Sequence, residues 1–326
     1  MLYKLYQLKF TTPVHFGSDK MGTSLEKVNL TCHSDTLFSA ICNEFLKIYD
    51  ELALDDYVDL FDEGKILISS LYPFKGEDLF LPKPSLIIER ANSKELEYSN
   101  KKKMKKLEFL KVLDFKRYLE CLKSGEPFTY DEADYTFAQY SDSAKVCLRT
   151  DDDKNKIYHV GSYTFERDAG LYFVARFKDE KYVEQFEKIL YSLQYTGIGG
   201  KRSSGYGKFE IEDPIELSDN LLESEEALLK LLQTDGNYRM LLSLASPDEV
   251  ELDLDYSDSF YNLIKRDGFV YSVDYADTLV KRKHLIMFKE GSCLAVDIQG
   301  TIQDVSDNGN HPVYRYGKAL SIGVEV

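Results

Sequence analysis

The sequence predicts an α+β protein made of two modules, and three observations lead to this fold class. A chain of 326 residues is long enough for two domains that each bury a core. Apolar residues make up 43% and charged residues 30%, which is typical of globular chains. Segments with the alternating hydrophobicity of strands are interspersed with segments that have the period of amphipathic helices. Both element types are therefore expected in each half.

The first module is predicted to cover residues 1–212. Its predicted elements are, in chain order, a strand over Tyr6–Phe10, a loop over Thr11–Leu25, a helix from Asp35 with Ser34 as N-cap, a strand over Gly64–Ser70, a strand over Gly170–Phe177, a helix over Lys181–Leu193 and a strand over Phe209–Ile211. With an insertion at about 85–145 set aside, this order is that of a ferredoxin-like (RRM-like) unit. Within the insertion, Lys101–Leu122 has a helix-like pattern.

The second module is predicted to cover residues 213–326 and to be a second ferredoxin-like domain. Its predicted elements are strands over Tyr238–Leu244, Phe269–Val273, His284–Phe288, Ser292–Val296 and Ala319–Val326, with a short helix over Ser257–Ile264. Pro214 and the acidic stretch that follows it mark the boundary between the modules.

The cysteines and the amino terminus predict a cytoplasmic protein. The five cysteines are an odd number and contain no C-x-x-C pair, so neither a disulfide framework nor a zinc site is expected. Lys4 and Lys9 interrupt what would have to be the apolar core of a signal peptide. No stretch of the sequence approaches the roughly 18 apolar residues of a membrane helix. We expect no membrane association and no cofactor.

The negative charge of the chain is concentrated in one segment. The formal net charge is −15, which would oppose nucleic acid if it were spread evenly. The span Glu210–Phe260 holds fifteen carboxylates against two basic residues, so it carries −13 of the total. The other residues are nearly neutral and contain basic runs, including Lys201-Arg202 and Lys281-Arg282-Lys283. A polyanion can therefore bind on selected faces, away from the acidic span.

The most informative segment is the glycine-rich loop Gly197–Lys208, with the sequence GIGGKRSSGYGK. Glycines allow the backbone to approach a ligand closely, and successive N–H groups can form an anion-binding nest beside Lys201 and Arg202. The Walker A loop and the dinucleotide fingerprint both require a helix after the loop, whereas here a strand follows. The pattern thus favours an extended phosphodiester chain over a mononucleotide, although composition alone also fits a flexible turn with a solvated Lys-Arg pair.

The glycine-rich loop resembles the carboxy-terminal glycine-rich loop of the RAMP superfamily of CRISPR-associated proteins. Four further stretches narrow the resemblance to the family of fourth Csm subunits of the type III-A CRISPR interference complex: HSDTLFSA from His33, LPKP from Leu81, FKEGS from Phe288 and HPVYRYG from His311. The resemblance covers both halves of the chain and is weakest between Glu89 and Asp142.

The resemblance implies a non-catalytic subunit of an antiviral Csm effector complex. Members of the family bind the repeat-derived 5′ handle of the crRNA and sit beside the large polymerase-like subunit and the first backbone subunit. A thumb in the first domain, here expected in the insertion after Pro84, disturbs the start of the duplex between guide and target RNA.

RNA contacts are predicted from four segments of the chain. The predicted residues are His15, Phe16, Ser18 and Lys20 after the first strand, His33 and Ser34 at the helix start, Gly199, Gly200, Lys201, Arg202, Ser203, Ser204, Gly205 and Tyr206 in the glycine-rich loop, and Lys281, Arg282 and Lys283. Lys201, Arg202 and the serines suit phosphates, and Tyr206 suits a stacked base. Asp35 would oppose a phosphate at the helix start, Ser34 also fits a plain N-cap, and Lys281–Lys283 also fit a charged strand edge.

Two other function classes are compatible with the sequence. The first is a RAMP-type metal-independent endoribonuclease that processes guide RNA precursors, with His15 or His33 as the general base. Neither histidine has an acid partner that is evident from the sequence. The second is an interaction module that contacts protein only.

Overall fold

The computed structural model describes residues 1–18, 25–87, 106–147, 156–272 and 274–326. It shows a mixed α/β chain in which the described strands pair in antiparallel sheets. The main sheet has the strand order β11 (Phe209–Ile211), β1 (Leu2–Phe10), β10 (Ala169–Phe177), β5 (Tyr72–Lys75), β6 (Asp78–Pro82) and β7 (Phe109–Lys111), with β4 (Ile66–Ile68) on β10 and β12 (Ile215–Glu216) on β1. The four predicted strands correspond to β1, β4, β10 and β11, which lie next to one another in this sheet.

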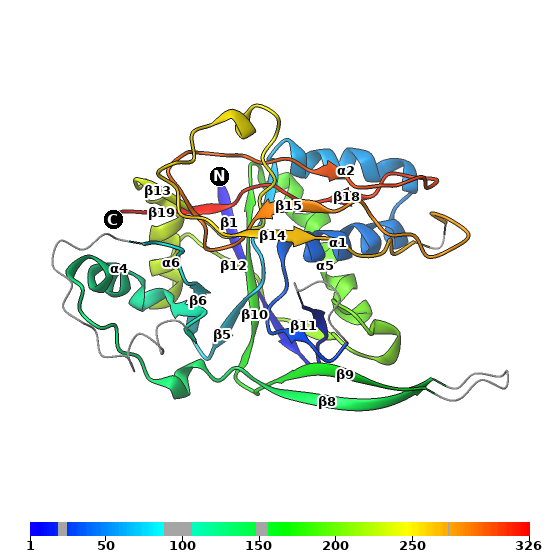
Figure 1. Cartoon of the computed structure of the whole chain (residues 1–326), viewed down its shortest axis with the longest axis horizontal. Coiled ribbons are helices and arrows are strands. Elements are labelled where there is room, and N and C mark those ends of the chain that lie inside the picture. The colour runs from blue at the N-terminus through cyan, green and yellow to red at the C-terminus, as the bar shows by residue number, and fades with distance from the viewer. Residues whose placement is uncertain (19–24, 88–105, 148–155, 273) are drawn as a thin grey trace.

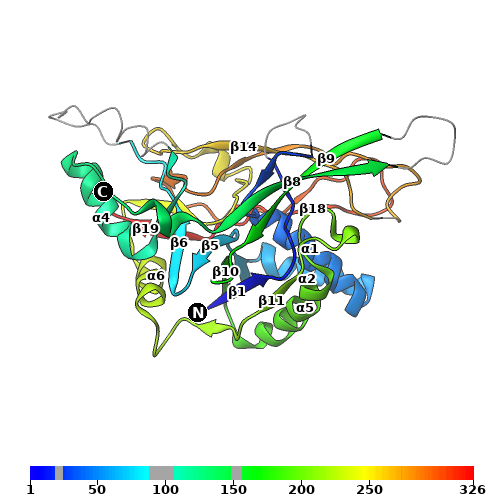
Figure 2. The ribbon, with the colours of Figure 1, turned by 90° about the horizontal axis from the view of Figure 1, so that it is seen from below.

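Both faces of the main sheet are buried, because apolar residues occupy consecutive positions of its strands. In β1, Leu5 joins the core on one face and Tyr6 the core on the other, and Tyr172 and Phe173 of β10 divide in the same way. The Tyr6 face packs against the helices α1 (Ser34–Ile48), α2 (Leu54–Asp62) and α5 (Val183–Thr196). The Leu5 face packs against α4 (Phe115–Ser124), α6 (Glu223–Gln233) and the C-terminal strands, so Figures 1 and 2 show helices on both sides of the sheet.

Two smaller ribbons lie next to the main sheet. The strands β8 (Ala138–Cys147) and β9 (Lys156–Phe165) form a long hairpin that extends along the lower edge of Figure 1. The short strands β2 (Phe16–Gly17) and β3 (Val28–Asn29) form a second pair. A bridge between Val14 and Tyr163 ties the segment before β2 to the hairpin.

The C-terminal half is built from short strands. A three-stranded sheet has the order β16 (Cys293–Leu294), β13 (Tyr238–Leu241) and β19 (Ser321–Val324), and two pairs are formed by β14 (Leu263–Arg266) with β15 (Leu285–Phe288) and by β17 (Gln303–Asp304) with β18 (Tyr314–Arg315). Single 3-10 turns lie at Glu51–Ala53, Val112–Asp114, Glu132–Tyr135, Glu180–Tyr182, Arg202–Ser204 and Glu251–Asp253. In Figure 1 this half reaches from α6 on one side of the main sheet to α2 on the other.

Three sequence predictions of secondary structure are wrong. Of the strand predicted over Phe269–Val273, the described residues form only a single bridge, between Phe269 and Lys281. The short helix predicted over Ser257–Ile264 is absent: Phe260 forms a bridge with Cys293, and β14 starts at Leu263. The helix-like stretch Lys101–Leu122 contains the strand β7, and α4 begins only at Phe115. Leu107 and Leu110 have helical spacing, but Leu110 pairs with Leu81 of β6, so sheet pairing overrides the local pattern. Lys101–Lys105, like Val273 in the second half, lie outside the described residues.

The two halves share both main cores, and one strand that follows the predicted boundary joins the main sheet. The core on the Leu5 face includes Met240 and Leu242 of the second half, and the core on the other face includes Tyr316. The strand β12 follows the boundary predicted at residue 212 but still pairs with β1. In the parts of the chain that the structure describes, no helix has the length and apolar character required to cross a membrane.

Candidate nucleic-acid interface

The glycine-rich loop packs directly on the segment after β1. The N–H of Gly200 donates to the carbonyl of His15 at 2.8 Å, and the N–H of Gly207 donates to the carbonyl of Pro13 at 2.8 Å. Gly199 has a φ of +91°, and a Cβ there would lie 2.9 Å from the His15 carbonyl oxygen. Only glycine permits this conformation and this close approach together. Two of the segments predicted to contact RNA therefore lie directly against each other.

The loop uses many of its N–H groups within the protein. The N–H of Ser204 donates to Lys201, that of Gly205 to Arg202, and that of Ile198 to the Gly207 carbonyl. The nest of free donors is therefore smaller than the glycine content predicts, and the side chains of Lys201 and Arg202 supply the positive charge.

Basic side chains and aromatic rings alternate around this loop. The Nζ of Lys201 lies 5.0 Å from the centroid of the Tyr158 ring on β9, and the Arg202 guanidinium lies 4.7 Å from the Tyr271 ring. Tyr206 is half-buried and faces Lys145 at 6.0 Å, whereas Tyr271 is 72% exposed. Tyr271, which the sequence did not suggest, is thus a more accessible stacking surface than Tyr206.

Two adjoining compartments, together called the groove, bring the predicted segments together. The central compartment has a volume of about 560 Å³ and is lined, among others, by His15, Phe16, Ser18, Lys27, His33, Gly199, Gly200, Lys265, Arg266 and Lys281. The second, here called the helix-side compartment, has a volume of about 440 Å³ and is lined by Asp35, Thr36, Ser39, Ala40, Asn43, Gly199, Gly200, Lys201, Arg202, Ser203, Phe269, Tyr271 and Arg282. Thr36, Gly199, Gly200 and Phe269 line both.

Some predicted residues lie elsewhere. Ser204, Gly205, Tyr206 and Lys283 are outside both compartments, as is Ser34, whose full burial contradicts its predicted RNA contact. Lys20 lies outside the described residues. Lys281 is exposed and forms a bridge with Phe269 instead of standing on the edge of a long strand.

A third and larger hollow continues from the central compartment. It has a volume of about 1300 Å³, shares Asn29, Thr31 and His33 with the central compartment and extends to Pro82 and Lys289. It therefore gathers residues of three motifs singled out in the sequence, HSDTLFSA, LPKP and FKEGS.

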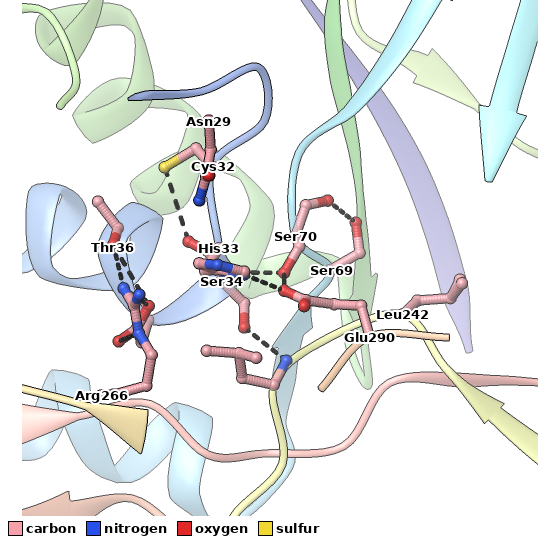
Figure 3. Close-up of polar contacts among 12 residues, drawn as sticks. Asn29, Cys32, His33, Ser34, Thr36, Ser69, Ser70, Leu242, Arg266 and Glu290 are labelled. Atoms are coloured by element: carbon pink, nitrogen blue, oxygen red, sulfur yellow. Dashed lines mark hydrogen bonds and ion pairs between the residues drawn. The ribbon is translucent and has the colours of Figure 1, made fainter. Parts of the chain in front are cut away.

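Ser34 does not cap α1, contrary to the sequence prediction. The helix begins at Ser34 itself, and His33 occupies the N-cap position without a capping bond from its side chain. The N–H of Ser34 instead donates to the Oγ of Ser70 at 2.8 Å. The Ser34 side chain is fully buried, and its Oγ accepts the N–H of Leu244 at 3.0 Å. Figure 3 shows this bond reaching from α1 to the C-terminal half. The hydroxyl that fits a local cap thus makes a long-range contact.

His33 also joins the two halves. Its Nδ1 lies 2.7 Å from Oε1 of Glu290, which also accepts the hydroxyl of Ser70 (Figure 3). Burial opposes ionisation of Glu290, but the imidazole of His33 and the Ser70 hydroxyl outweigh it and hold the pKa of the carboxyl below its usual value. His15 is similarly anchored, with its Nδ1 donating to the Gly161 carbonyl at 2.8 Å. Each histidine therefore has a structural partner.

Asp35 is neutralised by two arginines. Arg266 binds the carboxylate in a bidentate manner at 3.0 and 2.9 Å, and Arg315 donates to it at 2.6 Å. Burial would raise the pKa of Asp35, but these arginines dominate and hold it well below its ordinary value. Burial, together with the nearby Arg315, lowers the pKa of Arg282 to about 10. Three guanidinium groups here face the carboxylates of Asp35 and Asp267, which leaves this wall of the groove with a surplus of one positive charge.

Lys265 and Arg266 line the groove but were not among the predicted RNA contacts, although the sequence contains a signal for them. Lys265-Arg266 precedes Gly268, as Lys201-Arg202 precedes Gly205, and both basic pairs line the groove. Within the described ranges, no group of three or more His, Cys, Asp or Glu side chains is arranged to hold a metal ion.

Comparisons with known proteins identify the class of protein. A model of the RAMP superfamily matches residues 7–210, and a model described as the CRISPR Csm4 C-terminal domain matches residues 234–324. The class of protein is thus that of RAMP proteins. These two matches, together with the curated relatives described next, show that the chain belongs to the Csm4 family within that superfamily.

Curated relatives and solved structures cover almost the whole chain. Proteins named CRISPR system Cms protein Csm4 are 30% identical over 98% of this chain in Mycobacterium tuberculosis and 31% identical over 100% in Streptococcus thermophilus, with 97% and 100% of the relatives covered. A crystal structure of a Csm3-Csm4 subcomplex of the type III-A CRISPR-Cas interference complex matches with a TM-score of 0.64, 20% identity and coverage of 98% of this chain and 99% of the other. A Csm1-Csm4 cassette in complex with cA4 matches with a TM-score of 0.61, 22% identity and coverage of 100% and 99%.

Proposed function

We propose that this chain is a non-catalytic subunit of a type III-A CRISPR effector complex and holds the 5′ handle of the crRNA in the groove. The observation that carries the proposal is the meeting of the glycine-rich loop, the segment after β1 and the basic Lys265–Lys281 region around one groove. Single-stranded RNA is bound by such combinations of cationic side chains, exposed rings and hydrogen-bonding groups.

The proposed partners follow the solved relatives. Those structures contain Csm4 together with Csm1 or with Csm3, and we propose that this chain contacts the corresponding large and backbone subunits. Target RNA would then be reached only through its duplex with the guide. The strand order β11-β1-β10-β5, with α1 and α5 on one face, supports a ferredoxin-like first domain over residues 1–212. The second domain at 213–326 and a thumb in the insertion at about 85–145 remain part of this proposal.

Salt-dependent RNA binding tests the groove directly. A Lys201→Ala, Arg202→Ala double variant is expected to weaken crRNA binding by the complex reconstituted from its purified subunits. Each lost phosphate contact should also reduce the slope of log affinity against log salt by about 0.7 to 1. The measurement is equilibrium binding of fluorescent crRNA at several salt concentrations.

The chain offers a matched control for this variant. Lys181 lies 5.0 Å from the Tyr182 ring and Arg117 lies 4.4 Å from the Phe128 ring, and neither residue lines the groove. The Lys181→Ala, Arg117→Ala variant removes the same charges and the same type of ring contact, and its salt slope should equal that of the wild type. If both double variants show the same slope of log affinity against log salt, the glycine-rich loop is not part of the RNA interface.

A further inference from the structure

The segment Glu249–Tyr256 has a sequence pattern that the fold does not use. Its sequence, EVELDLDY, alternates carboxylates with apolar residues, as a strand with one buried face does. All of this segment is described by the structure, and it forms no strand there, because the 3-10 turn Glu251–Asp253 interrupts it. Its apolar side chains are left at the surface: Val250 is 76% exposed, Leu252 65% and Leu254 37%.

Glu251 holds this turn in a defined shape. Its carboxylate accepts the backbone N–H groups of Gln299 at 2.5 Å and of Gly300 at 3.0 Å. The N–H of Glu251 donates to Oδ1 of Asp248 at 2.8 Å, and its carboxylate accepts the N–H of Asp248 at 3.2 Å. The hydroxyl of Tyr256 donates to the carbonyl of Glu251 at 2.8 Å. The exposed apolar side chains therefore stand on an ordered backbone, which lowers the entropic cost of binding a partner.

Tyr256 connects the turn to further exposed apolar side chains. Its ring centroid lies 6.3 Å from that of Tyr261 and 5.3 Å from that of Phe288. Tyr261 is 43% exposed, and Leu263, the first residue of β14, is 58% exposed. Five exposed large apolar side chains thus fall within Val250–Leu263. Single apolar side chains are ordinary on a protein surface, whereas such a concentration marks an interaction site.

Carboxylates surround these apolar side chains. Six lie between residues 248 and 258, without a lysine or arginine among them: Asp248, Glu249, Glu251, Asp253, Asp255 and Asp258. The buried Lys318 interacts with Asp248 and Glu251, whereas Glu249 and Asp253 are exposed. Such a rim repels the phosphates of RNA, and it would repel itself in a symmetric pair of copies of this chain. A protein with basic residues has the complementary charge.

The turn lies away from the groove. In Figure 1 it is the yellow segment at the top, whereas the β8–β9 hairpin, which carries Tyr158 close to Lys201, runs along the lower edge. Residues 248–255, each of them described by the structure, do not line either compartment of the groove. A partner can therefore bind the turn while RNA occupies the groove.

We infer that the turn Asp248–Asp255 docks into an apolar pocket, rimmed by lysines or arginines, on another protein subunit. Val250 and Leu252 enter the pocket, and Glu249 and Asp253 face its basic rim. Burial of the two aliphatic side chains supplies affinity, and the opposite charges speed association. The inference rests on the proposed function, because the partner is a subunit of the same effector complex.

Binding of the purified full-length chain to each purified partner subunit, without RNA, tests the turn. Surface plasmon resonance gives the affinity for the large and for the backbone subunit separately. We expect the Val250→Ser, Leu252→Ser double variant to weaken binding to one of these subunits by about tenfold or more. Because both side chains are exposed, the thermal melting of the chain should stay unchanged.

The chain offers a matched control for the loss of exposed apolar side chains. Leu52 is 88% exposed and lies on another 3-10 turn, Glu51–Ala53, whose N-cap Asp50 is also acidic. The Leu52→Ser variant removes the same kind of side chain from the same kind of turn. It should bind both subunits as tightly as the wild type does.

A second double variant tests the chemistry of the rim. Glu249→Gln with Asp253→Asn keeps the side-chain shapes and removes two charges. Association with the same subunit should become slower and less dependent on salt, with little change in dissociation. The control Asp219→Asn with Glu223→Gln removes two exposed charges of the same acidic span outside the turn, and it should keep the wild-type kinetics. An unchanged salt dependence in the rim variant would overturn the basic character of the partner.

The outcomes separate the inference from the proposed function. If the wild type binds a subunit and the Val250→Ser, Leu252→Ser variant binds it equally well, the turn is not a docking surface, although the complex remains. If the wild type binds neither subunit, the proposed function fails first and the inference with it. Weaker crRNA binding by the reconstituted complex, with subunit binding intact, would make the turn an RNA contact and overturn the inference.

Discussion

The two halves of the chain hold their structure in different ways. In the N-terminal half, β1 pairs with β10 over seven positions, from Leu2 opposite Phe177 to Leu8 opposite Leu171, and both faces of the sheet are buried. In the C-terminal half, the strands have two to four residues and, apart from β12, belong to separate small sheets. Short pairs of this kind are marginal in isolation.

The C-terminal half is held largely by contacts with the N-terminal half. Tyr316 lies in the core beside Phe38 and Phe61, and its hydroxyl accepts the N–H of Ile68 at 2.9 Å. The hydroxyl of Tyr72 donates to the Leu242 carbonyl at 2.7 Å. We therefore expect the C-terminal half to open when contacts between the halves are broken, while β1 and β10 stay protected.

The largest effect is expected from Asp35→Asn, which leaves Arg266 and Arg315 without their counter-charge. Because Asp35 and Arg315 are buried, the loss should be about 3–5 kcal/mol of unfolding free energy. Urea denaturation measures the loss, and amide hydrogen exchange should show it first in β14 and β18. Asp235 pairs with Arg239 while 94% exposed, so Asp235→Asn should change stability little. Equal losses of unfolding free energy in the two variants would contradict the conclusion that buried contacts between the halves hold the C-terminal half.

A smaller, pH-dependent effect is expected from Glu290→Gln. Loss of the charged contact with His33 should cost about 1.5–3 kcal/mol near neutral pH. The folded pKa of Glu290 lies below its ordinary value of 4.5, so its contribution is present above that pH and is lost as the pH falls through the folded pKa. Denaturation at several pH values should thus show the difference from the wild type shrinking below about pH 4. A difference that stayed constant down to pH 3 would show that the Glu290 charge is not involved.

The smallest effect is expected from Ser34→Ala. The variant leaves the buried N–H of Leu244 without its acceptor, at a cost of about 1 kcal/mol. Hydrogen exchange distinguishes this contact from a cap: protection should fall at Leu244 and remain unchanged in the first turn of α1. Fraying of that turn with Leu244 unaffected would restore the capping role that the sequence suggested.

In the N-terminal half the sequence predicted α1, α5, β1, β4, β10 and β11, but it missed α2 and the strands β5, β6, β8 and β9. The helix α5 and the strands β1 and β10 have a clear period because one or both faces meet a core over many residues. The C-terminal half has no such period. Phe260 and Cys293 meet in a single bridge, and the approach of such short segments depends on packing across the whole chain.

The candidate site was predictable where chemistry was concentrated in one segment. Glycines beside Lys201-Arg202 directed attention to the correct loop, and the order of elements placed His15 next to it. Tyr271 could not be found in this way, because it is an isolated residue whose role depends on what packs opposite. Ser34 was misinterpreted for the same reason: its bonding partner is 210 residues away.

The groove is lined by residues from His15 to Arg282, and the half that supplies Lys265 and Arg282 is completed by β19 near the carboxyl end. During translation, the nascent chain therefore has its glycine-rich loop long before it has a groove. A product truncated before β19 would lack the strand that pairs with β13 over four positions. If the groove holds guide RNA as proposed, we expect such a product to bind it more weakly than the full chain.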